Sequence, residues 1–284
     1  MLFFPPAKLN LGLFVTGKRP DGFHDLESVF VPIQWTDILE LHAVEGPPGT
    51  LAMEYTGLAI PGVEAGGNLV ERAHGLLVGA GRKLPALSGR LHKVVPMGAG
   101  LGGGSADGAW MLRAIDRVTG WEAGAEGQRP FAEALGSDCP FFLQDGPAFV
   151  HGRGEHIEPI GDAMWTEAFV AVVHPGVHVS TKEAFGRLAV RPAPMDLRRL
   201  AALPVKEWHA AGVGNDFTPG VAASVPAVAD ALALVADGAL YSQMTGTGSA
   251  VFGLYPTWEA AARAADGAAL RGWATWFGPL GSAH

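Results

Sequence analysis

The chain has very little cysteine, with Cys139 as the one cysteine among 284 residues. A single cysteine excludes a disulfide within the chain and is typical of proteins kept in a reducing compartment. No residue adjacent to Cys139 supports a nucleophilic role, so we expect a small buried side chain there. The spacing of Cys and His residues also fits no zinc site, and we predict no protein-built metal centre.

Charged residues are scarce as well, at 17% of the chain, and the formal net charge is −8. This balance excludes a general nucleic-acid binder, which needs a basic face. It does not exclude an anionic small molecule, which needs only a few local cations. No apolar run reaches transmembrane length, and the first residues lack the pattern of a signal peptide. We therefore expect a cytoplasmic protein without nucleic-acid or membrane partners.

What the chain does contain is glycine, concentrated in the stretch Pro96–Gly108. The stretch follows the β-branched pair Val94 and Val95 and leads into residues 109–118, where apolar residues recur at helical spacing. Its glycines allow positive φ and close approach of a ligand to the backbone. We expect Ser105 to cap the helix, so that free N–H groups and the helix dipole meet at one point. This pattern favours a phosphate-binding loop over a flexible surface loop.

The residues around the loop exclude several known types of phosphate-binding loop. Gly98, Gly100 and Gly103 satisfy a dinucleotide-binding pattern, with Glu122 at roughly the expected distance of about 20 residues. That pattern needs a second strand before the acidic residue, and residues 119–127 read as a loop. A Walker A loop needs a lysine that is missing here. The signature strands and loops of protein kinases are also absent. The loop alone therefore indicates only phosphate.

Two further places carry candidate polar groups. Lys8 and Asn10 lie two apart in an apolar stretch, so on a strand both side chains face the same side. Lys8 could extend to solvent at a sheet edge or reach into a polar site, and the sequence favours neither. Asp138 precedes Pro140, so it could cap a short helix or place a carboxylate beside a phosphate site.

The order of predicted elements indicates a mixed α+β protein of two domains. Strands come first, followed by a helix, the strand before the glycine loop, and the helix after it. Beyond about residue 160 the order of strands and helices suggests an α/β plait. We place the domains at residues 1–158 and 159–284.

Three stretches taken together resemble the GHMP kinase superfamily: Pro6–Leu13, Pro96–Ser105 and Met244–Phe252. Within it, Gly17–Leu26 and Gly136–Phe142 resemble the kinases that phosphorylate 4-diphosphocytidyl-2-C-methyl-D-erythritol. The resemblance implies an N-terminal domain of the ribosomal protein S5-like type, a ferredoxin-like C-terminal plait, and an active site in the cleft between them. It also implies ATP-dependent phosphorylation of the 2-hydroxyl of that alcohol, in the non-mevalonate route to isoprenoids.

The resemblance assigns roles to single residues. Asp138 matches the catalytic carboxylate and Lys8 its partner lysine. Asn68 and Lys93 match positions near the adenosine of ATP. The positions that would hold its phosphates are Pro96, Gly98, Ala99, Gly100, Leu101, Gly102, Gly103, Gly104 and Ser105. Those that would hold the cytidylated substrate are Asn10, Phe23, His24, Thr181, Phe185 and Gly246. ATP implies Mg²⁺, although no acidic pair stands out as its cage. We expect a monomer or weak homodimer.

Two positions depart from the family pattern. Phe23 stands where tyrosine is often found, which keeps ring stacking but loses a phenol hydrogen bond. Asp107 stands where relatives can carry asparagine, so it is left out of the expected site. The alternatives are another alcohol kinase of the superfamily, a catalytically silent nucleotide-binding protein, and, more distantly, a dinucleotide oxidoreductase.

Overall fold

The computed structural model describes residues 1–60, 68–161, 163–186, 188 and 190–281. Contacts divide the chain into two compact units that interleave along the sequence. The first comprises residues 1–7, 35–97 and 102–145, and the second comprises residues 8–34, 98–101 and 146–284. The boundary expected between residues 158 and 159 stays a prediction. In the described part of the chain no single helix is long and apolar enough to span a membrane. One pair of helices has the length and composition of a span when taken together, but the two are bent by 119°.

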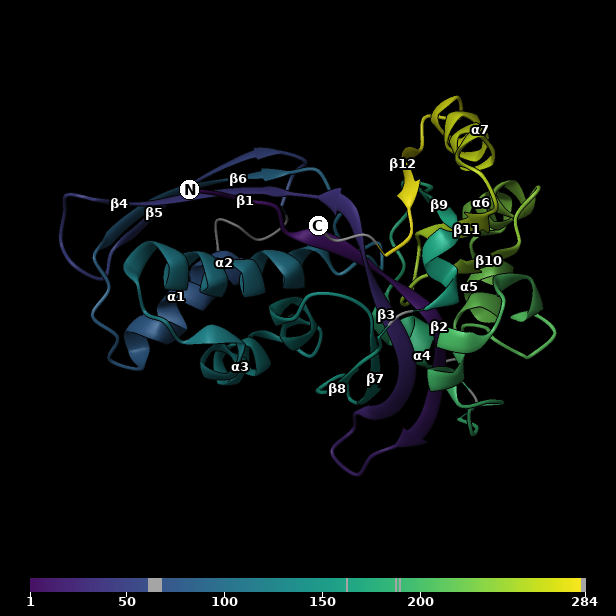
Figure 1. Cartoon of the computed structure of the whole chain (residues 1–284), viewed down its shortest axis with the longest axis horizontal. Coiled ribbons are helices and arrows are strands. Elements are labelled where there is room, and N and C mark those ends of the chain that lie inside the picture. The colour runs from purple at the N-terminus through teal and green to yellow at the C-terminus, as the bar shows by residue number, and fades with distance from the viewer. Residues whose placement is uncertain (61–67, 162, 187, 189, 282–284) are drawn as a thin grey trace. The chain divides into compact units, whose positions relative to one another are not determined.

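The first unit is a four-stranded sheet covered by helices on one face (Figure 1). The order is β1-β4-β6-β5, with β5 and β6 parallel and the other pairs antiparallel. The strands are β1 (Leu2–Phe3), β4 (Ile38–Val44), β5 (Leu51–Gly57) and β6 (Ala86–Lys93). The helices are α1 (Leu69–Gly79), α2 (Gly103–Thr119), α3 (Gly124–Leu135) and the 3₁₀ helix η2 (Cys139–Leu143).

Local sequence explains how these helices begin and which faces they bury. The side chain of Asn68 accepts a hydrogen bond from the Val70 N–H, 3.0 Å away, and so caps α1. In α2, Met111, Leu112 and Ile115 are fully buried, as their helical spacing predicts. The loop expected over residues 119–127 is shorter than predicted because α3 already begins at Gly124.

The second unit contains two sheets. The first has the order β2-β3-β7-β8 and consists of β2 (Pro6–Lys18), β3 (His24–Thr36), β7 (Ala148–Gly152) and β8 (His156–Pro159). β2 and β3 are long, and both begin or end in the first unit. The turn between β7 and β8 holds Arg153, as the Gly-Arg-Gly sequence predicts.

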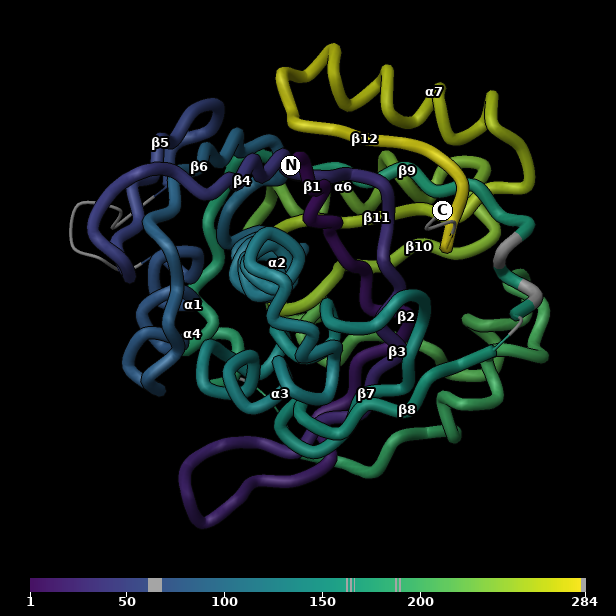
Figure 2. The backbone as a smooth tube through the Cα atoms, turned by 60° about the vertical axis from the view of Figure 1, so that its left-hand side comes forward, coloured from purple at the N-terminus to yellow at the C-terminus, as the bar shows by residue number. Residues whose placement is uncertain are grey.

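The other sheet of this unit has the order β10-β11-β9-β12, and every neighbouring pair is antiparallel. Its strands are β9 (Phe169–His174), β10 (Tyr241–Met244), β11 (Val251–Tyr255) and β12 (Ala274–Pro279). The helices α6 (Pro226–Ala236) and α7 (Trp258–Ala269) pack on this sheet (Figure 2). This strand order, in which the first strand is central, is that of a ferredoxin-like plait.

Short helices complete the second unit. They are α4 (Thr181–Gly186), α5 (Thr218–Ser224) and the 3₁₀ helices η3 (Met164–Glu167), η4 (Leu197–Ala202) and η5 (Val205–Glu207). The core between α4, α5, α6 and the sheet is apolar and includes Val173, Phe217 and Val251. The predicted mixed α+β architecture is therefore confirmed.

Candidate functional site

The glycine loop lies between the end of β6 and the start of α2, as predicted. Gly98, Gly100 and Gly102 have φ values of 66°, 80° and 71°, which L side chains rarely adopt. The prediction that Ser105 caps α2 is wrong. The left-handed conformation of Gly102 turns the chain into the helix earlier, so that Gly102 is the cap residue and α2 begins at Gly103.

The start of α2 is suited to an anion. Glycine brings no side chain to accept from the first N–H groups, and no acidic residue stands in the first turn. The amides of Gly103, Gly104 and Ser105 precede the first N–H that bonds within the helix, which is Ala106 N–H to Gly102 O at 2.9 Å. With the positive end of a 17-residue helix, these amides favour a phosphate.

Asp138 stands beside this helix start within the first unit. It occupies the cap position of η2, but its side chain makes no capping hydrogen bond. The purely capping role considered for it is therefore wrong. η2 packs against α2, and the thiol of the next residue, Cys139, is hydrogen-bonded to Ser105 in the first turn of α2. Burial raises the pKa of the Cys139 thiol to about 12, which excludes a reactive thiolate near neutral pH.

Lys8 and Asn10 lie side by side on β2 in the second unit, as their spacing predicts. Lys8 is only 3% exposed, so it does not extend to solvent. Its Nζ donates to Asn10 Oδ1 at 2.6 Å and lies 4.8 Å from the centre of the Phe30 ring. Asn10 Nδ2 in turn donates to Ser28 Oγ at 2.9 Å. The lysine is thus oriented by a buried polar network.

The turn at Gly246 joins this network. Asn10 Oδ1 accepts from the Gly246 N–H at 2.8 Å and lies 3.0 Å from Thr245 Oγ1. The turn also packs on the glycine loop, because a Cβ at Gly246 would lie 2.9 Å from the Cα of Gly100. A Cβ at Gly100 would lie 2.2 Å from the Thr245 carbonyl oxygen. Both positions therefore require glycine.

The two residues expected near the adenosine are both buried in the first unit. Asn68 is 8% exposed, and its Nδ2 has no hydrogen-bond partner among the described residues. Lys93 is 1% exposed, and its Nζ donates to the carboxylates of Asp37 and Asp107. Asn68 therefore has an unused donor, whereas the ammonium of Lys93 already has two partners.

Two of the residues expected to hold the cytidine, His24 and Phe185, lie against each other. His24 and Phe185 have ring centres 4.8 Å apart, and Phe185 packs edge-on against Phe217. Phe23 is 51% exposed and has the Arg153 guanidinium over its ring, 4.3 Å from the ring centre. Thr181, exposed at the start of α4, has its hydroxyl 3.4 Å from that of Thr247.

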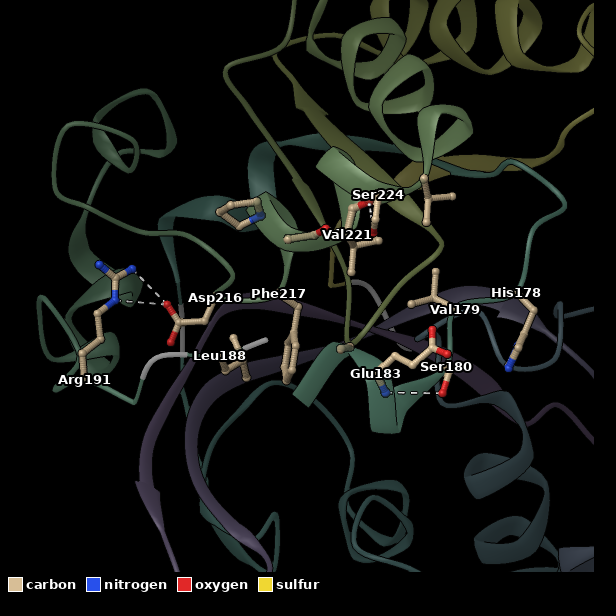
Figure 3. Close-up of a pocket in the computed structure, with 14 residues that line it drawn as sticks. His178, Val179, Ser180, Glu183, Leu188, Arg191, Asp216, Phe217, Val221 and Ser224 are labelled. Carbon is tan, nitrogen blue, oxygen red and sulfur yellow. Dashed lines mark hydrogen bonds and ion pairs between the residues drawn. The ribbon is translucent and has the colours of Figure 1, made fainter. Parts of the chain in front are cut away.

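A cavity of about 290 Å³ lies beside α4 and α5, and none of the residues expected in the site lines it (Figure 3). One end carries Glu183, whose N–H donates to Ser180 Oγ at 3.4 Å. The other end carries the ion pair of Arg191 with Asp216, at 2.9 Å. Its walls between these ends are mostly apolar and include Val179, Phe217 and Val221, together with the polar Ser224.

Sequence reasoning missed several polar residues at these places. Asp37 carries no local signal, because its role depends on Lys93, which lies 56 positions away. Thr245 and Arg153 lie in turns, and local sequence does not show their partners. Only Asp107 carried a signal, since it follows the glycine loop by one helical turn.

Comparison with protein families matches two regions of the chain. The family of GHMP kinases N terminal domains matches residues 68–153. The family of GHMP kinases C terminal domains matches residues 199–272. The first match contains the glycine loop and Asp138, and the second contains the Gly246 turn.

The chain is 38% identical to a protein of Bacteroides fragilis named 4-diphosphocytidyl-2-C-methyl-D-erythritol kinase, over 90% of this chain and 92% of that protein. A protein of the same name from Chlorobium luteolum is 36% identical over 92% of this chain and 90% of that protein. A crystal structure of 4-(cytidine 5'-diphospho)-2C-methyl-D-erythritol kinase has a TM-score of 0.79 and 32% identity, covering both chains fully. A homoserine kinase from Cytophaga hutchinsonii, at 17% identity and a TM-score of 0.69 over 97% of this chain and 95% of that one, shares the fold.

Proposed function

The chain belongs to the GHMP kinase family and, within it, to the 4-diphosphocytidyl-2-C-methyl-D-erythritol kinases, and we propose that it catalyses their reaction. In this reaction the γ-phosphoryl group of ATP is transferred to the 2-hydroxyl of 4-diphosphocytidyl-2-C-methyl-D-erythritol. The protein is thus a phosphotransferase with an alcohol as acceptor, in the non-mevalonate route to isoprenoids. The two-domain α+β fold expected from the sequence agrees with both family matches.

The observation that carries this proposal is the contact between the start of α2 and η2, which Asp138 immediately precedes. Phosphoryl transfer needs positioning and charge neutralisation more than covalent chemistry. The amides of Gly103, Gly104 and Ser105 are oriented in advance toward phosphate oxygens, so they would stabilise the developing charge without rearranging. A carboxylate next to them is placed to accept the proton of the attacking hydroxyl.

Lys8 is proposed to act with Asp138. A lysine ammonium close to the carboxylate would keep it ionised and would orient the hydroxyl for attack. The hydrogen bonds that connect Lys8, Asn10 and Gly246 support this role, because they hold the ammonium in one direction. Asn10 and Gly246 would hold the methylerythritol part of the substrate from the same network.

The cytidine is proposed to bind at the rings of Phe23, His24 and Phe185, with Thr181 beside them. Phe23 is half exposed, with the Arg153 guanidinium over its ring. The exposed part of the ring would stack on cytosine. His24 is held against Phe185 and can hydrogen-bond a pyrimidine edge through its ring nitrogens.

ATP is the co-substrate of this family, and we propose that Mg²⁺ accompanies it. In the described residues no group of three or more His, Cys, Asp or Glu side chains is placed to hold a metal ion. Ser105, in the first turn of α2, and Asp138, at the start of η2, carry oxygens of the kind that Mg²⁺ prefers. The ion would be held mainly by phosphate oxygens and water. A cytoplasmic location and a monomer or weak homodimer remain predictions.

The experiment is to incubate the protein with ATP, Mg²⁺ and one of three alcohols: 4-diphosphocytidyl-2-C-methyl-D-erythritol, homoserine or mevalonate. We expect phosphate transfer to the first alone, with the new ester at the 2-hydroxyl by ³¹P NMR. Transfer to homoserine or mevalonate would instead indicate a different alcohol kinase of the family. A folded protein that binds ATP and phosphorylates none of them would contradict the proposal.

A further inference from the structure

A buried cluster of three charged side chains lies beside the first turn of α2, and the proposed chemistry does not use it. Lys93 Nζ donates to Asp37 Oδ2 and, at 2.7 Å, to Asp107 Oδ2. The three side chains are at most 3% exposed. Burying ions costs several kcal/mol for each, so such a cluster is a costly way to stabilise a core. We therefore looked for a functional role of the cluster in the residues that it contacts.

The cluster joins the two ends of the glycine loop. Lys93 is the last residue of β6, just before the loop, and Asp107 is the fifth residue of α2, just after it. A Cβ at Gly103 would lie 3.1 Å from Lys93 Nζ and 3.0 Å from Val95 Cγ1. The first turn of α2 therefore packs against Lys93 and Val95.

Asp37 fixes the backbone at the loop entrance. Its Oδ1 accepts from the N–H groups of Val94 and Val95, at 2.6 and 2.8 Å, where the sheet hydrogen bonds of β6 have ended. Its own N–H donates to the Pro5 carbonyl at 2.9 Å. One carboxylate therefore holds both the lysine and the two peptide groups that set the direction of the loop.

We propose that Asp37, Lys93 and Asp107 form a clamp that preorganises the glycine loop for the phosphates of ATP. The three are positioning residues that act through the loop backbone and the first turn of α2, so the inference rests on the proposed function. The clamp also limits the charge beneath the helix start. With one carboxyl protonated the cluster is neutral, whereas a second negative charge there would repel phosphate.

The charges around Asp107 support this limit. Burial raises the pKa of Asp107 to about 8, the Lys93 ammonium opposes the rise, and the Asp37 carboxylate adds to it. Tyr55 of β5 also interacts with Asp107, and Glu71 of α1 interacts with Tyr55. Burial and Glu71 raise the Tyr55 pKa as well, so that Tyr55 stays neutral where Asp107 titrates.

The first test compares Asp37→Asn and Lys93→Met with the matched control Arg90→Met. Arg90 lies on β6 but on its exposed face, paired with Glu54. We expect both cluster variants to bind a non-hydrolysable ATP analogue about tenfold more weakly or worse, with CDP affinity within about twofold of the parent. We also expect faster hydrogen exchange at the Val94 and Val95 amides. Arg90→Met should match the parent throughout.

The second test uses Asp107→Asn, which mimics the protonated carboxyl and should fold even if the other variants do not. The parent should lose about threefold or more of its affinity for the ATP analogue between pH 7 and pH 9, beyond any change in Asp107→Asn. A folded Asp37→Asn variant with parental affinity for the ATP analogue would overturn the clamp. So would identical pH dependence in the parent and Asp107→Asn. Absence of CDP binding to the parent would count against the proposed function. The affinities for the ATP analogue would still show whether the clamp exists.

Discussion

Lys8 and Lys93 are both buried lysines, and each makes hydrogen bonds within its own unit. Lys93 donates to two carboxylates, so its charge is neutralised inside the first unit. Lys8 donates to the neutral amide oxygen of Asn10 and lies over the face of Phe30. These contacts hold its ammonium in one orientation. The contact of Lys93 with the first turn of α2 supports its proposed role in positioning the loop, and the network around Asn10 supports the proposed role of Lys8 at the reacting groups.

The role of Asp138 as the proton acceptor predicts a specific defect. Asp138→Asn should lower kcat by about 10²- to 10⁴-fold, because the amide cannot take the proton of the attacking hydroxyl. Affinity for an ATP analogue should stay within about twofold, since the loop amides are unchanged. The control is Asp145→Asn, an exposed carboxylate in the same unit that pairs with Arg113. A kcat of Asp138→Asn equal to that of the control would disprove the role.

The contact between Arg153 and Phe23 predicts a defect in substrate binding alone. Arg153→Ala removes the guanidinium that covers one face of the ring, so Phe23 would lose its fixed orientation. An exposed contact of this kind contributes about 0.5–1 kcal/mol, so KM for the cytidylated substrate should rise about two- to fivefold. KM for ATP should not change. Arg129→Ala, on the exposed face of α3, is the control and should leave both KM values as they are.

Among the structural elements, α2 shows most clearly what the sequence can predict. The helix, the strand before it and the glycine loop between them follow from apolar spacing and glycine content. The cap residue could not be predicted in this way. The choice between Gly102 and Ser105 depends on the backbone φ of 71° at Gly102, which local sequence does not determine. The cap formed by Asn68 is of a kind that sequence can predict, because its hydrogen bond lies within two residues.

The close packing of the Gly246 turn on the glycine loop predicts a stability defect. Gly100→Ala would place a Cβ 2.2 Å from the Thr245 carbonyl oxygen in a backbone with φ of 80°. We expect a loss of about 2 kcal/mol or more in the free energy of unfolding. The control is Gly75→Ala on α1, where nothing lies within 4 Å. That variant should gain about 0.5–1 kcal/mol. Urea unfolding measures both, and an undiminished stability of Gly100→Ala would contradict the packing.

For the whole molecule, the sequence predicted the α+β architecture and the family, but not the buried charges. Asp37 is hydrogen-bonded to Lys93 and to the Val94 amide, which lie 56 and 57 positions away in the sequence. No local sequence pattern reports contacts at such a separation. The same limit applied to Arg153 and Phe23, which belong to different turns. Motif residues were predictable because their spacing is local, whereas the groups that support them depend on the folded chain.

The buried cluster predicts how the stability of the protein changes with pH. The Asp107 pKa is raised from 3.8 to about 8 in the folded state, so the folded protein keeps a proton that the unfolded chain loses above about pH 4. This contribution to the free energy of unfolding is complete below about pH 4 and declines as pH rises through about 8. Between pH 5 and pH 9 the parent should lose at least about 1 kcal/mol relative to Asp107→Asn. Parallel curves in urea unfolding would show that Asp107 has an ordinary pKa.

The most direct measurement of the central claim is kcat/KM for two acceptors, 4-diphosphocytidyl-2-C-methyl-D-erythritol and the same sugar alcohol without its cytidine diphosphate. The account predicts efficient phosphorylation of the first and at least about 10²-fold lower kcat/KM for the second, because the aromatic pocket and its binding energy are unused. Equal values for the two alcohols would contradict the assignment of Phe23, His24 and Phe185 to the substrate. No ATP-dependent phosphorylation of either, in a folded protein that binds ATP, would contradict the kinase itself.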